Sequence, residues 1–402
     1  MCAMISNGIN GLIPAGMRDW LPPEAGRKRD LINRLLQNIS TWGYDEISSP
    51  LLEYYHIFNR KEAGTGPDNY YKLIERDGSL LVLRPEMTTP IARIIGGKLP
   101  GDPPWRLMYG EEVFRYELVQ AGRQRGFHQV GVELVGESSA WADSEVLALA
   151  ISSLLKAGLE KFKVSLGHMG VFNALLNSLM LNETSLEEVR RLILEKDFAG
   201  LQEFTEESTL PDKNAMHLLQ YFTKSWSLKE IEQIIPSLEE NIRKPFEELA
   251  NIIGILDIYG YARYIQVDLS TLRSQEYYSG MVFEIYTPGI GYPIGGGGRY
   301  DNLLRQYGRD CPATGFALGI ERILLSMQLL NEVPKTLLLA GETKQAAVSE
   351  KMIQKAARLR EEGHKVILEL QPLTKNQALK LAEKTGTELI YWQGESIKWK
   401  ED

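Results

Sequence analysis

FRYELVQAGRQRGFHQVGVELVG, residues 114–136, is the stretch that decides the fold. Two runs of alternating apolar and polar residues are joined by a polar loop that contains glycine, which predicts two antiparallel strands. Arginine binds phosphate through two parallel hydrogen bonds, whereas carboxylates in the same cleft would hold an ammonium group. The stretch carries both kinds of side chain: Arg115, Arg123, Arg125, Glu117, Gln129 and Glu133. Together they predict a site for a nucleotide and an amino acid.

A simpler interpretation of these charges stays open at this point. Charged residues in strands commonly lie on the solvated face of a hairpin and bind nothing. A second stretch, GFALGIER (315–322), sets small residues before Glu321 and Arg322 at the expected start of an apolar helix. Gly315 and Gly319 would allow close packing on a sheet, but alone this pattern is an ordinary strand-to-helix junction. Further signals are needed to choose between these interpretations.

The run GYPIGGGGRYD (291–301) places four consecutive glycines before an arginine and a tyrosine. It lacks both the Gly-Lys-Ser/Thr of a Walker loop and the Gly-x-Gly-x-x-Gly of a dinucleotide-binding turn. Without side chains, glycines let a backbone approach a ligand or a neighbouring strand closely. We therefore expect a strand beneath a small-molecule pocket, in which the run positions Tyr300 and Arg299.

The composition excludes several classes of protein. The chain has 402 residues, enough for two or three domains, and its 44% hydrophobic and 24% charged residues are typical of a globular protein. No run approaches the roughly 18 apolar residues of a spanning helix, and the N-terminus lacks a signal peptide, so we expect a cytoplasmic protein without a membrane partner. The net charge of −8 argues against a surface that coats nucleic acid.

Metal sites and disulfides are not expected either. The two cysteines, Cys2 and Cys311, are far apart and have no Cys or His partner at ligand spacing. The five histidines are also scattered along the chain. We therefore predict no metal site and no cofactor.

Strand patterns dominate the first part of the chain. Residues 27–44 have the apolar spacing of an amphipathic helix that stops at Gly43, and Asp77-Gly78 between two alternating runs predicts a hairpin. Further strand-like runs cover 105–118, 126–136, 161–168, 263–270 and 280–287. Because turns rather than helices are expected between them, they predict an antiparallel sheet.

Two later segments have different patterns. Residues 171–250 are charged, rich in leucine and helical in period, which predicts a helical insertion into the sheet domain. After Pro334 strands alternate with helices, which predicts a small α/β domain with parallel strands over 334–402. The expected fold is therefore α+β, with a core formed by 1–170 and 251–330.

Together these stretches resemble the core of the class II aminoacyl-tRNA synthetases, and specifically the histidyl branch. The three class motifs are matched by GYDEISSPLLE, by FRYE with its loop and VELVG, and by GFALGIER. Two histidyl-type peptides have altered counterparts in LRSQEYYSG (272–280) and GGGGRYDNL (295–303). The resemblance covers residues 12–330 in the right order and implies a class II-like antiparallel sheet core. The C-terminal α/β segment lies where that family carries its anticodon-binding domain.

The resemblance also implies roles for individual residues. Contacts with a nucleotide would fall to Arg115 and Arg322 at the phosphates and to Glu117 near the adenine. Contacts with histidine would fall to Glu86, Thr88, Gln129, Glu133, Arg273, Tyr278 and Tyr300. Of these, the first four would surround the amino group and backbone, the arginine would meet the carboxylate and the reacting phosphate, and the two tyrosines would line the imidazole pocket.

Three departures favour a paralogue of the synthetases. Met87 replaces the glycine of the family's Arg-Pro-Glu-Gly-Thr, where the backbone should approach the substrate. The peptide from Arg273 reads Arg-Ser-Gln-Glu-Tyr-Tyr, so the family's glycine and aspartate are both changed. Only 69 residues follow Val333, too few for a full anticodon-binding domain, and their 12 Lys/Arg against 10 Asp/Glu lack the basic excess of a phosphate-binding surface. These departures, and the phrase at 283–308, resemble the regulatory subunits of ATP phosphoribosyltransferase.

This second resemblance implies a function and partners. The chain would be a regulatory, non-catalytic subunit in the first step of histidine biosynthesis, required by a short-form catalytic subunit and mediating feedback by histidine as effector. It would form a homodimer within a hetero-oligomer and would not bind tRNA. An authentic histidyl-tRNA synthetase is the alternative, because a non-catalytic subunit has no evident need for Arg115, Arg273 and Arg322. These arginines could instead bind a phosphorylated ligand or hold the sheet together by ion pairs, and another class II-like ligase or a scaffold also stays open.

Overall fold

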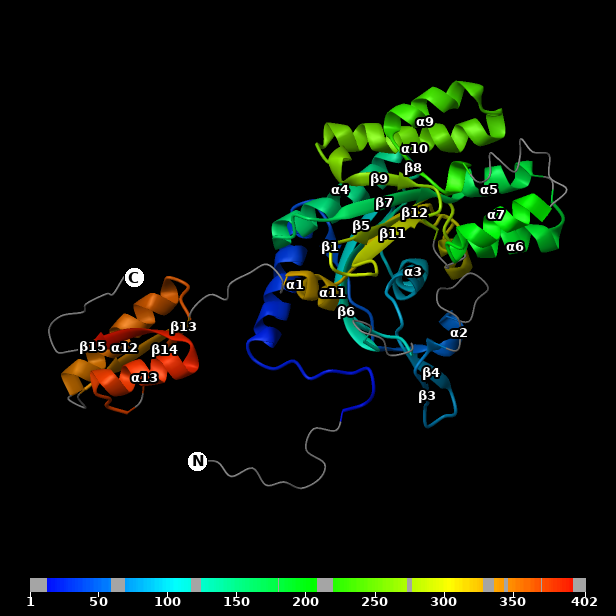
Figure 1. Ribbon diagram of the computed structural model, residues 1–402. Helices are drawn as coiled ribbons and strands as arrows, with labels where there is room; N and C mark the ends of the chain where they lie inside the picture. The colour runs from blue at the N-terminus through cyan, green and yellow to red at the C-terminus, as the bar shows by residue number, and fades with distance from the viewer. Residues whose placement is uncertain are drawn as a thin grey trace. The chain divides into compact units, whose positions relative to one another are not determined.

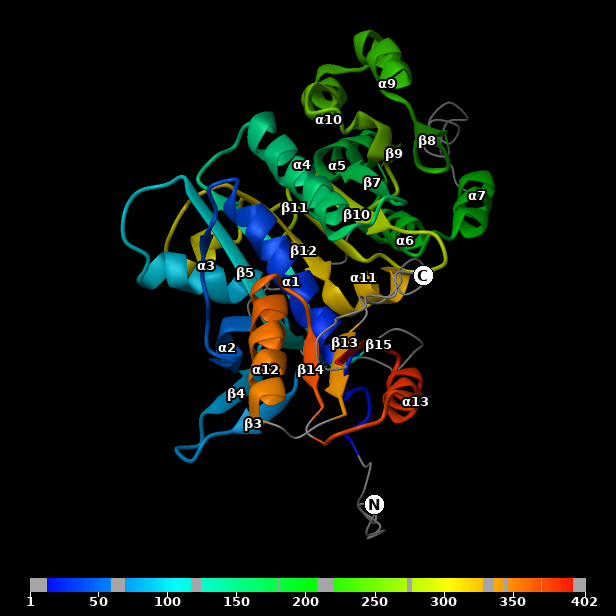
Figure 2. The ribbon, with the colours of Figure 1, turned by 90° about the vertical axis from the view of Figure 1, so that its left-hand side faces the viewer.

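The computed structural model forms two compact units, Met1–Leu329 and Leu330–Asp402, each with a sheet of its own. Figures 1 and 2 show the chain in two views at right angles. The structure describes residues 13–58, 69–116, 124–179, 181–207, 220–272, 277–327, 336–342, 346–369 and 371–392.

A nine-stranded sheet forms the centre of the first unit, and its strands follow the order β1-β5-β6-β12-β11-β10-β7-β9-β8. In that order their bounds are Asp45–Glu46, Trp105–Phe114, Gly126–Val135, Ala313–Gly319, Gly295–Arg299, Met281–Tyr286, Lys163–His168, Ile265–Asp268 and Ser225–Trp226. Neighbours are antiparallel except for the β1–β5 and β7–β9 pairs, which are parallel. The predicted antiparallel sheet core is therefore confirmed, and the two parallel pairs occur where long connections lead the chain back in the same direction.

The strand pair β5–β6 contains both ends of the loop in the stretch that decides the fold, Phe114 at the end of β5 and 126–135 as β6. In the antiparallel register Tyr109 lies opposite Gly131, and Glu111 lies opposite Gln129. Because side chains alternate along a strand, the even-numbered apolar residues of β6 point to one face and Gln129 and Glu133 to the other. The even-numbered residues Val130, Val132 and Leu134 belong to the main apolar core.

Helices cover the apolar face of the sheet (Figure 2). Helix α1 (Glu24–Ser40) buries Leu31, Leu35 and Ile39 against this core, as the apolar spacing predicts. Helix α4 (Ala140–Ala157) lies between β6 and β7, where only turns were expected. Most of its residues are buried, so it lacks the polar stripe by which an amphipathic helix is recognised. Helix α11 (Ile320–Met327) directly follows β12, which confirms the strand-to-helix junction at GFALGIER.

A largely helical segment follows β7. Its helices are α5 (Met169–Ser178), α6 (Glu183–Leu194), α7 (Phe198–Glu207), α9 (Leu228–Ile234), the 3-10 turn Ile235–Ser237 and α10 (Glu240–Ile258). The sequence did not indicate strand β8, which lies within this segment and pairs with β9 at the edge of the central sheet. The chain re-enters the sheet through a 3-10 turn, Ala262–Tyr264, and β9.

A small three-stranded sheet stands beside the central one. It has the order β2-β4-β3, with β2 at Leu52–Tyr54, β3 at Lys72–Ile74 and β4 at Leu80–Leu83. Strands β3 and β4 are antiparallel and flank Asp77-Gly78, which confirms the predicted hairpin. The short helix α2 (Tyr55–Phe58) follows β2, and helix α3 (Thr88–Gly97) follows β4. A 3-10 turn, Leu304–Tyr307, packs against α3.

The second unit is a small α/β fold with a wholly parallel sheet. Its elements in chain order are β13 (Thr336–Gly341), α12 (Ala346–Glu361), β14 (Val366–Leu368), α13 (Lys375–Thr385) and β15 (Thr387–Trp392). The strand order is β14-β13-β15, and both pairs are parallel. The alternation of strands and helices seen in the sequence is thus confirmed. Among the described parts of the chain, no helix combines the length and apolar character needed to cross a membrane.

Candidate functional site

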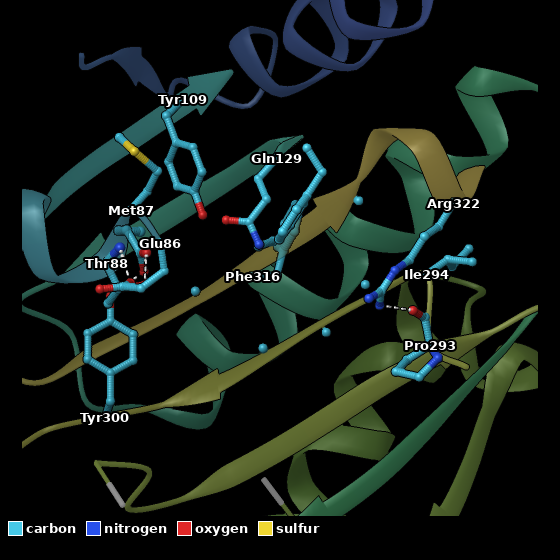
Figure 3. Close-up of a pocket in the computed structure, with 18 of the residues that line it drawn as sticks. Glu86, Met87, Thr88, Tyr109, Gln129, Pro293, Ile294, Tyr300, Phe316 and Arg322 are labelled. Carbon is cyan, nitrogen blue, oxygen red and sulfur yellow. Dashed lines mark hydrogen bonds between the residues drawn. The ribbon is translucent and has the colours of Figure 1, made fainter. Parts of the chain in front are cut away.

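A pocket lies on the sheet face opposite the main core, above strands β5, β6, β11 and β12 (Figure 3). About 740 Å³ of space lies between its atoms, open solvent included. Arg322 lies at one end, Glu86, Thr88 and Tyr300 lie at the other, and Tyr109, Gln129 and Phe316 lie between them (Figure 3).

Glycines form the floor of this pocket. Gly295, Gly296 and Gly297 of β11 line it, as does Gly315 of β12. A Cβ on Gly297 would come within 2.0 Å of the Gly315 carbonyl oxygen, so only glycine permits this strand spacing. The four-glycine run is therefore a strand beneath a pocket, as the sequence indicates, and the strands can lie flat against whatever the pocket holds.

Gly315 also makes room for a carboxylate. In the β6–β12 register it lies opposite Glu133, and a Cβ there would come within 2.0 Å of Glu133 Oε2. A similar relationship holds between Gly131 and Tyr109, where a Cβ would come within 2.4 Å of the phenol oxygen. The glycines thus give space to the polar side chains of neighbouring strands.

Two buried carboxylates meet through one threonine. Glu86 accepts hydrogen bonds from the backbone nitrogens of Thr88, at 2.7 Å, and Thr89, at 3.0 Å, where helix α3 begins. The hydroxyl of Thr88 donates to Glu133 Oε1 at 2.8 Å. Glu86 is 4% exposed and Glu133 2% exposed, so both carboxylates have lost nearly all their contact with water.

Tyr300 holds the second oxygen of Glu133. Its hydroxyl donates a hydrogen bond to Glu133 Oε2, and the tyrosine is itself buried. Arg299, one residue earlier, points to the other face and pairs with Asp143 of α4 at 2.9 Å. The expectation that the glycine run positions both residues at the pocket is therefore confirmed for Tyr300 and wrong for Arg299, because successive side chains of a strand alternate.

Burial changes the acidity of this cluster. Burial raises the pKa of Glu133 to about 8, although the hydrogen bonds from Tyr300 and Thr88 act in the opposite direction. Burial also raises the pKa of Glu86, and the hydrogen bonds from Thr89 and the charge of Arg115 oppose that shift. Both shifts have the sign expected when a carboxylate loses its water. The pocket end formed by these residues therefore favours a proton or a cation.

Gln129 adds a third acceptor. Its side chain is 9% exposed and lines the pocket between the two ends. Within the described residues its Oε1 atom has no hydrogen-bond partner. A buried acceptor without a partner is costly, and a ligand N–H group would remove that cost.

Two arginines bring positive charge to the same pocket. Arg115 donates from Nε to the carbonyl of Pro85 at 2.8 Å, and its guanidinium lies 5.4 Å from the Phe127 ring centroid. Arg322, on α11, donates to the carbonyl of Pro293 at 2.7 Å. One nitrogen of each guanidinium is thus fixed by a backbone carbonyl, which orients the planar group.

Of the ten residues to which the resemblance gives roles, eight line this one pocket: Glu86, Thr88, Arg115, Gln129, Glu133, Tyr278, Tyr300 and Arg322. The other two, Glu117 and Arg273, lie outside the described residues. Their roles stay predictions, as do the ligands of the eight.

Sequence reasoning missed the aromatic lining. Tyr109, Phe127 and Tyr277 also border the pocket, as does Phe316 of β12, whose side chain belongs to the main core. Tyr109 could have been found from its position opposite Gly131, but that position is known only once the strand register is known.

Met87 was expected to lie where the backbone meets a ligand. It lines the pocket, but its side chain is 1% exposed, packs in an apolar cluster with Ile91 and Tyr109, and has its sulfur 4.0 Å from the hydroxyl of Ser49. Its backbone φ is −107°, a conformation open to any residue, so a glycine is not required here.

In the described ranges no group of three or more His, Cys, Asp or Glu side chains is arranged to hold a metal ion. Cys311 is a free thiol of intermediate exposure.

The chain is similar to proteins of known family. Residues 16–323 match the family model described as histidyl-tRNA synthetase. The chain is 37% identical over 385 residues to the ATP phosphoribosyltransferase regulatory subunit of Moorella thermoacetica, covering 95% of this chain and 98% of that protein.

Solved structures agree with this assignment. A structure from Bacillus halodurans titled as an ATP phosphoribosyltransferase regulatory subunit/histidyl-tRNA synthetase superposes with a TM-score of 0.82 at 32% identity, covering 97% of this chain and all of that one. Histidyl-tRNA synthetase from Nostoc superposes with a TM-score of 0.80 at 20% identity, over 95% of this chain and 91% of that one, which supports the shared fold alone. The chain therefore belongs to the ATP phosphoribosyltransferase regulatory subunit family, and its first unit is a histidyl-tRNA synthetase-like α+β domain.

Proposed function

We propose that this protein is a regulatory, non-catalytic subunit that binds histidine and controls a short-form catalytic subunit of ATP phosphoribosyltransferase, at the first step of histidine biosynthesis. The names of its relatives support the regulatory role. The proposal includes a cytoplasmic location, a homodimer within a hetero-oligomer, and no binding of tRNA.

One observation carries the ligand assignment. Glu86 and Glu133 bring buried acceptors to one end of the pocket, and Gln129 adds a third between the two ends, whose oxygen lacks a partner within the described residues. Acceptors that are buried together suit a ligand that brings several N–H donors and a positive charge. The ammonium group of an amino acid has both properties.

The aromatic side chains beside these acceptors suit a planar ring. Tyr277, Tyr278 and Tyr300 line the same end of the pocket, with the Tyr277 and Tyr300 rings 5.7 Å apart and nearly perpendicular. The imidazole of histidine would fit such an environment, since aromatic faces and edges bind planar rings favourably. Histidine is thus the amino acid that the proposal names.

Regulation then needs a difference in affinity. If histidine binds one global state of the complex more tightly than the other, it shifts the equilibrium toward that state and changes the activity of the partner. A ligand with equal affinity for both states would shift nothing, however tightly it bound.

The test is reconstitution with the partner. This chain and a short catalytic subunit should co-purify, phosphoribosyl transfer should require both, and histidine should inhibit the complex. Gln129→Leu should leave the complex active but weaken inhibition by histidine, whereas Glu284→Gln, on β10 and outside the pocket, should leave inhibition unchanged. A lone catalytic subunit with full activity, or a complex indifferent to histidine, would contradict the proposal.

A histidyl-tRNA synthetase is the second candidate, and one observation favours it. Arg115 and Arg322 line the same pocket as the carboxylates, so the groups needed to bind ATP phosphates and an amino acid are present together. An aminoacylating enzyme would show histidine-dependent pyrophosphate exchange and charging of histidine tRNA by the purified chain. Either activity would replace the regulatory proposal with this one.

A further inference from the structure

We propose that Glu133 carries a proton in the ligand-free protein and releases it to solvent when the ammonium group of a bound amino acid takes the proton's place. The inference rests on the proposed histidine site and adds how that site is regulated: occupancy by histidine becomes linked to pH. At the Glu133 carboxyl the exchange balances, because the positive charge of the ammonium group takes the place of the proton, which leaves to solvent.

The first support is the arrangement of the two carboxylates. Glu86 and Glu133 are both buried and both bonded to Thr88, Glu86 to its backbone nitrogen and Glu133 to its hydroxyl. Two carboxylates joined through one residue in a dry site repel each other when both are charged. One of them needs a proton or a cation at neutral pH.

The second support identifies which carboxylate takes the proton. The partners of Glu86 are backbone N–H groups, which can only donate and so favour the charged form, and the charge of Arg115 favours it too. The partners of Glu133 are the hydroxyls of Thr88 and Tyr300. A hydroxyl can donate or accept, so these two residues can serve the carboxylate and the carboxylic acid equally. The geometry assigns the proton to Glu133.

Within the described residues, the surroundings of Glu133 do not supply a cation in its place. The loop before α3 contributes Glu86, β5 contributes the neutral phenol of Tyr109 and the apolar Leu107 opposite Glu133, and β12 contributes Gly315. Tyr300 follows β11, and burial raises its pKa well above the ordinary value, so it is neutral. Tyr277 and Tyr278 complete this end of the pocket with phenol groups. Arg115 is the cation nearest to this cluster among its described lining residues, and it acts on Glu86.

The third support is the side-chain oxygen of Gln129. Gln129 presents an oxygen with no partner within the described residues, and it lies between Tyr109 and Phe316 in the view of Figure 3. A proton on Glu133 satisfies Glu133 alone, whereas an ammonium group has three N–H donors and can serve Glu133, Glu86 and Gln129 at once. The ammonium group therefore gives the Gln129 oxygen a hydrogen-bond donor, which a proton on Glu133 does not.

Calorimetry with the full chain tests this exchange. Histidine is titrated near pH ~7.5, where its free imidazole is mostly neutral, in two buffers with low and high ionisation enthalpy. Because burial raises the pKa of Glu133 to about 8, we expect roughly one half to one proton released per histidine bound. Infrared difference spectra should show the loss of a protonated carboxylic acid on binding.

Two variants assign the proton. Glu133→Gln cannot hold it, so the acid band should be absent and any remaining binding heat should not depend on the buffer. Glu284→Gln is the matched control, because the Tyr286 hydroxyl donates to Glu284 at 2.5 Å as Tyr300 does to Glu133, yet neither residue lines the pocket. This control should release the same number of protons as the wild-type protein.

Each outcome decides a different question. Histidine heat that is equal in both buffers, with no acid band lost, overturns the proton exchange and leaves the histidine site standing. Buffer-dependent heat that persists in Glu133→Gln also overturns the assignment to Glu133. No histidine heat in either buffer, with the protein folded, overturns the histidine site itself and the exchange with it.

Discussion

The hydroxyl of Tyr300 donates a hydrogen bond to the carboxylate of Glu133, and the two residues are 167 positions apart in the chain. Both side chains are almost wholly buried, at 3% and 2% exposure. Glu133 comes from β6 and Tyr300 directly follows β11, so two strands separated by β12 supply the pair. The bond therefore exists because of the order of the strands in the sheet.

Gly315→Ala should disrupt this pair. The new Cβ would come within 2.0 Å of Glu133 Oε2 and 2.4 Å of the Val132 carbonyl oxygen, so the carboxylate and the strand must both shift. We expect a loss of about 1–3 kcal/mol in unfolding free energy and a large loss of histidine affinity. Denaturant unfolding and calorimetry would measure the two effects.

Gly254→Ala provides the control for that substitution. Gly254 lies inside helix α10, and a Cβ there meets nothing within 4 Å. Alanine should stabilise the helix by roughly 0.5–1 kcal/mol and leave histidine binding unchanged. Equal behaviour of the two glycine variants would contradict the role given to Gly315.

Glu133→Gln should make the protein more stable at high pH. Burial raises the pKa of Glu133 from 4.5 to about 8, so its contribution is complete below the unfolded value and is lost as pH rises toward 8. A glutamine never ionises. At pH ~9 the free energy of unfolding of the variant should therefore exceed that of the wild-type protein by a few kcal/mol. Urea unfolding of both proteins at pH ~5 and pH ~9 checks the sign of this effect. A difference in stability between variant and wild type that is the same at both pH values would refute the prediction.

Gln129→Leu should separate ligand binding from stability. The buried Oε1 atom has no partner within the described residues, so removing it costs the ligand-free fold little. Histidine would lose a hydrogen-bond acceptor for its charged amine, and affinity should fall roughly tenfold or more. Calorimetry measures the affinity and thermal unfolding the stability. A variant that binds histidine as well as the wild type would remove Gln129 from the site.

Asp143→Ala should destabilise the first unit strongly. Asp143 on α4 pairs with Arg299 at 2.9 Å, and both side chains are 7% exposed. Removing Asp143 leaves the buried Arg299 guanidinium with Asp301, at 3.1 Å, as its remaining carboxylate partner among the described residues, and should cost about 3 kcal/mol. Arg305→Ala breaks the Arg305–Asp310 pair, whose side chains are 66% and 68% exposed, and should cost less than about 1 kcal/mol. Comparable losses in the two variants would contradict this ranking.

His168 should make stability fall in mild acid. Burial, and then the charge of Arg299, lowers the pKa of His168 to about 4, so the neutral ring is the native form. The unfolded chain takes up the proton near pH ~6.5, so this contribution is complete above that pH and is lost as pH falls toward 4, by roughly 3 kcal/mol in all.

His168→Asn tests this assignment. Asparagine can still cap α5, where His168 Nδ1 accepts a hydrogen bond from the Val171 nitrogen at 3.4 Å, but it does not titrate. The loss of stability between pH ~7 and pH ~5 should be smaller in this variant. An equal loss in both proteins would show that other groups are responsible.

Local patterns in the sequence predicted much of the fold. The alternation in 126–135 gave a strand with an apolar and a polar face, and the amphipathic spacing gave α1. The pattern failed for α4, which is buried on most sides and so carries no polar stripe. The sequence pattern also failed to indicate that β1 pairs with β5 in parallel, because the sequence of one strand does not specify which strand it pairs with.

The sequence by itself determined which residues could form a site, because the glycines, carboxylates and arginines stand in short, recognisable stretches. The tertiary structure alone decided that Glu86, Glu133 and Tyr300 meet, that Arg299 turns away to Asp143, and that Met87 packs inward. The physical reason is that strand order, register and the loss of water are set by contacts between distant segments. Hence the sequence could supply Glu133 as a carboxylate, but only its burial in the folded sheet raises its pKa to about 8.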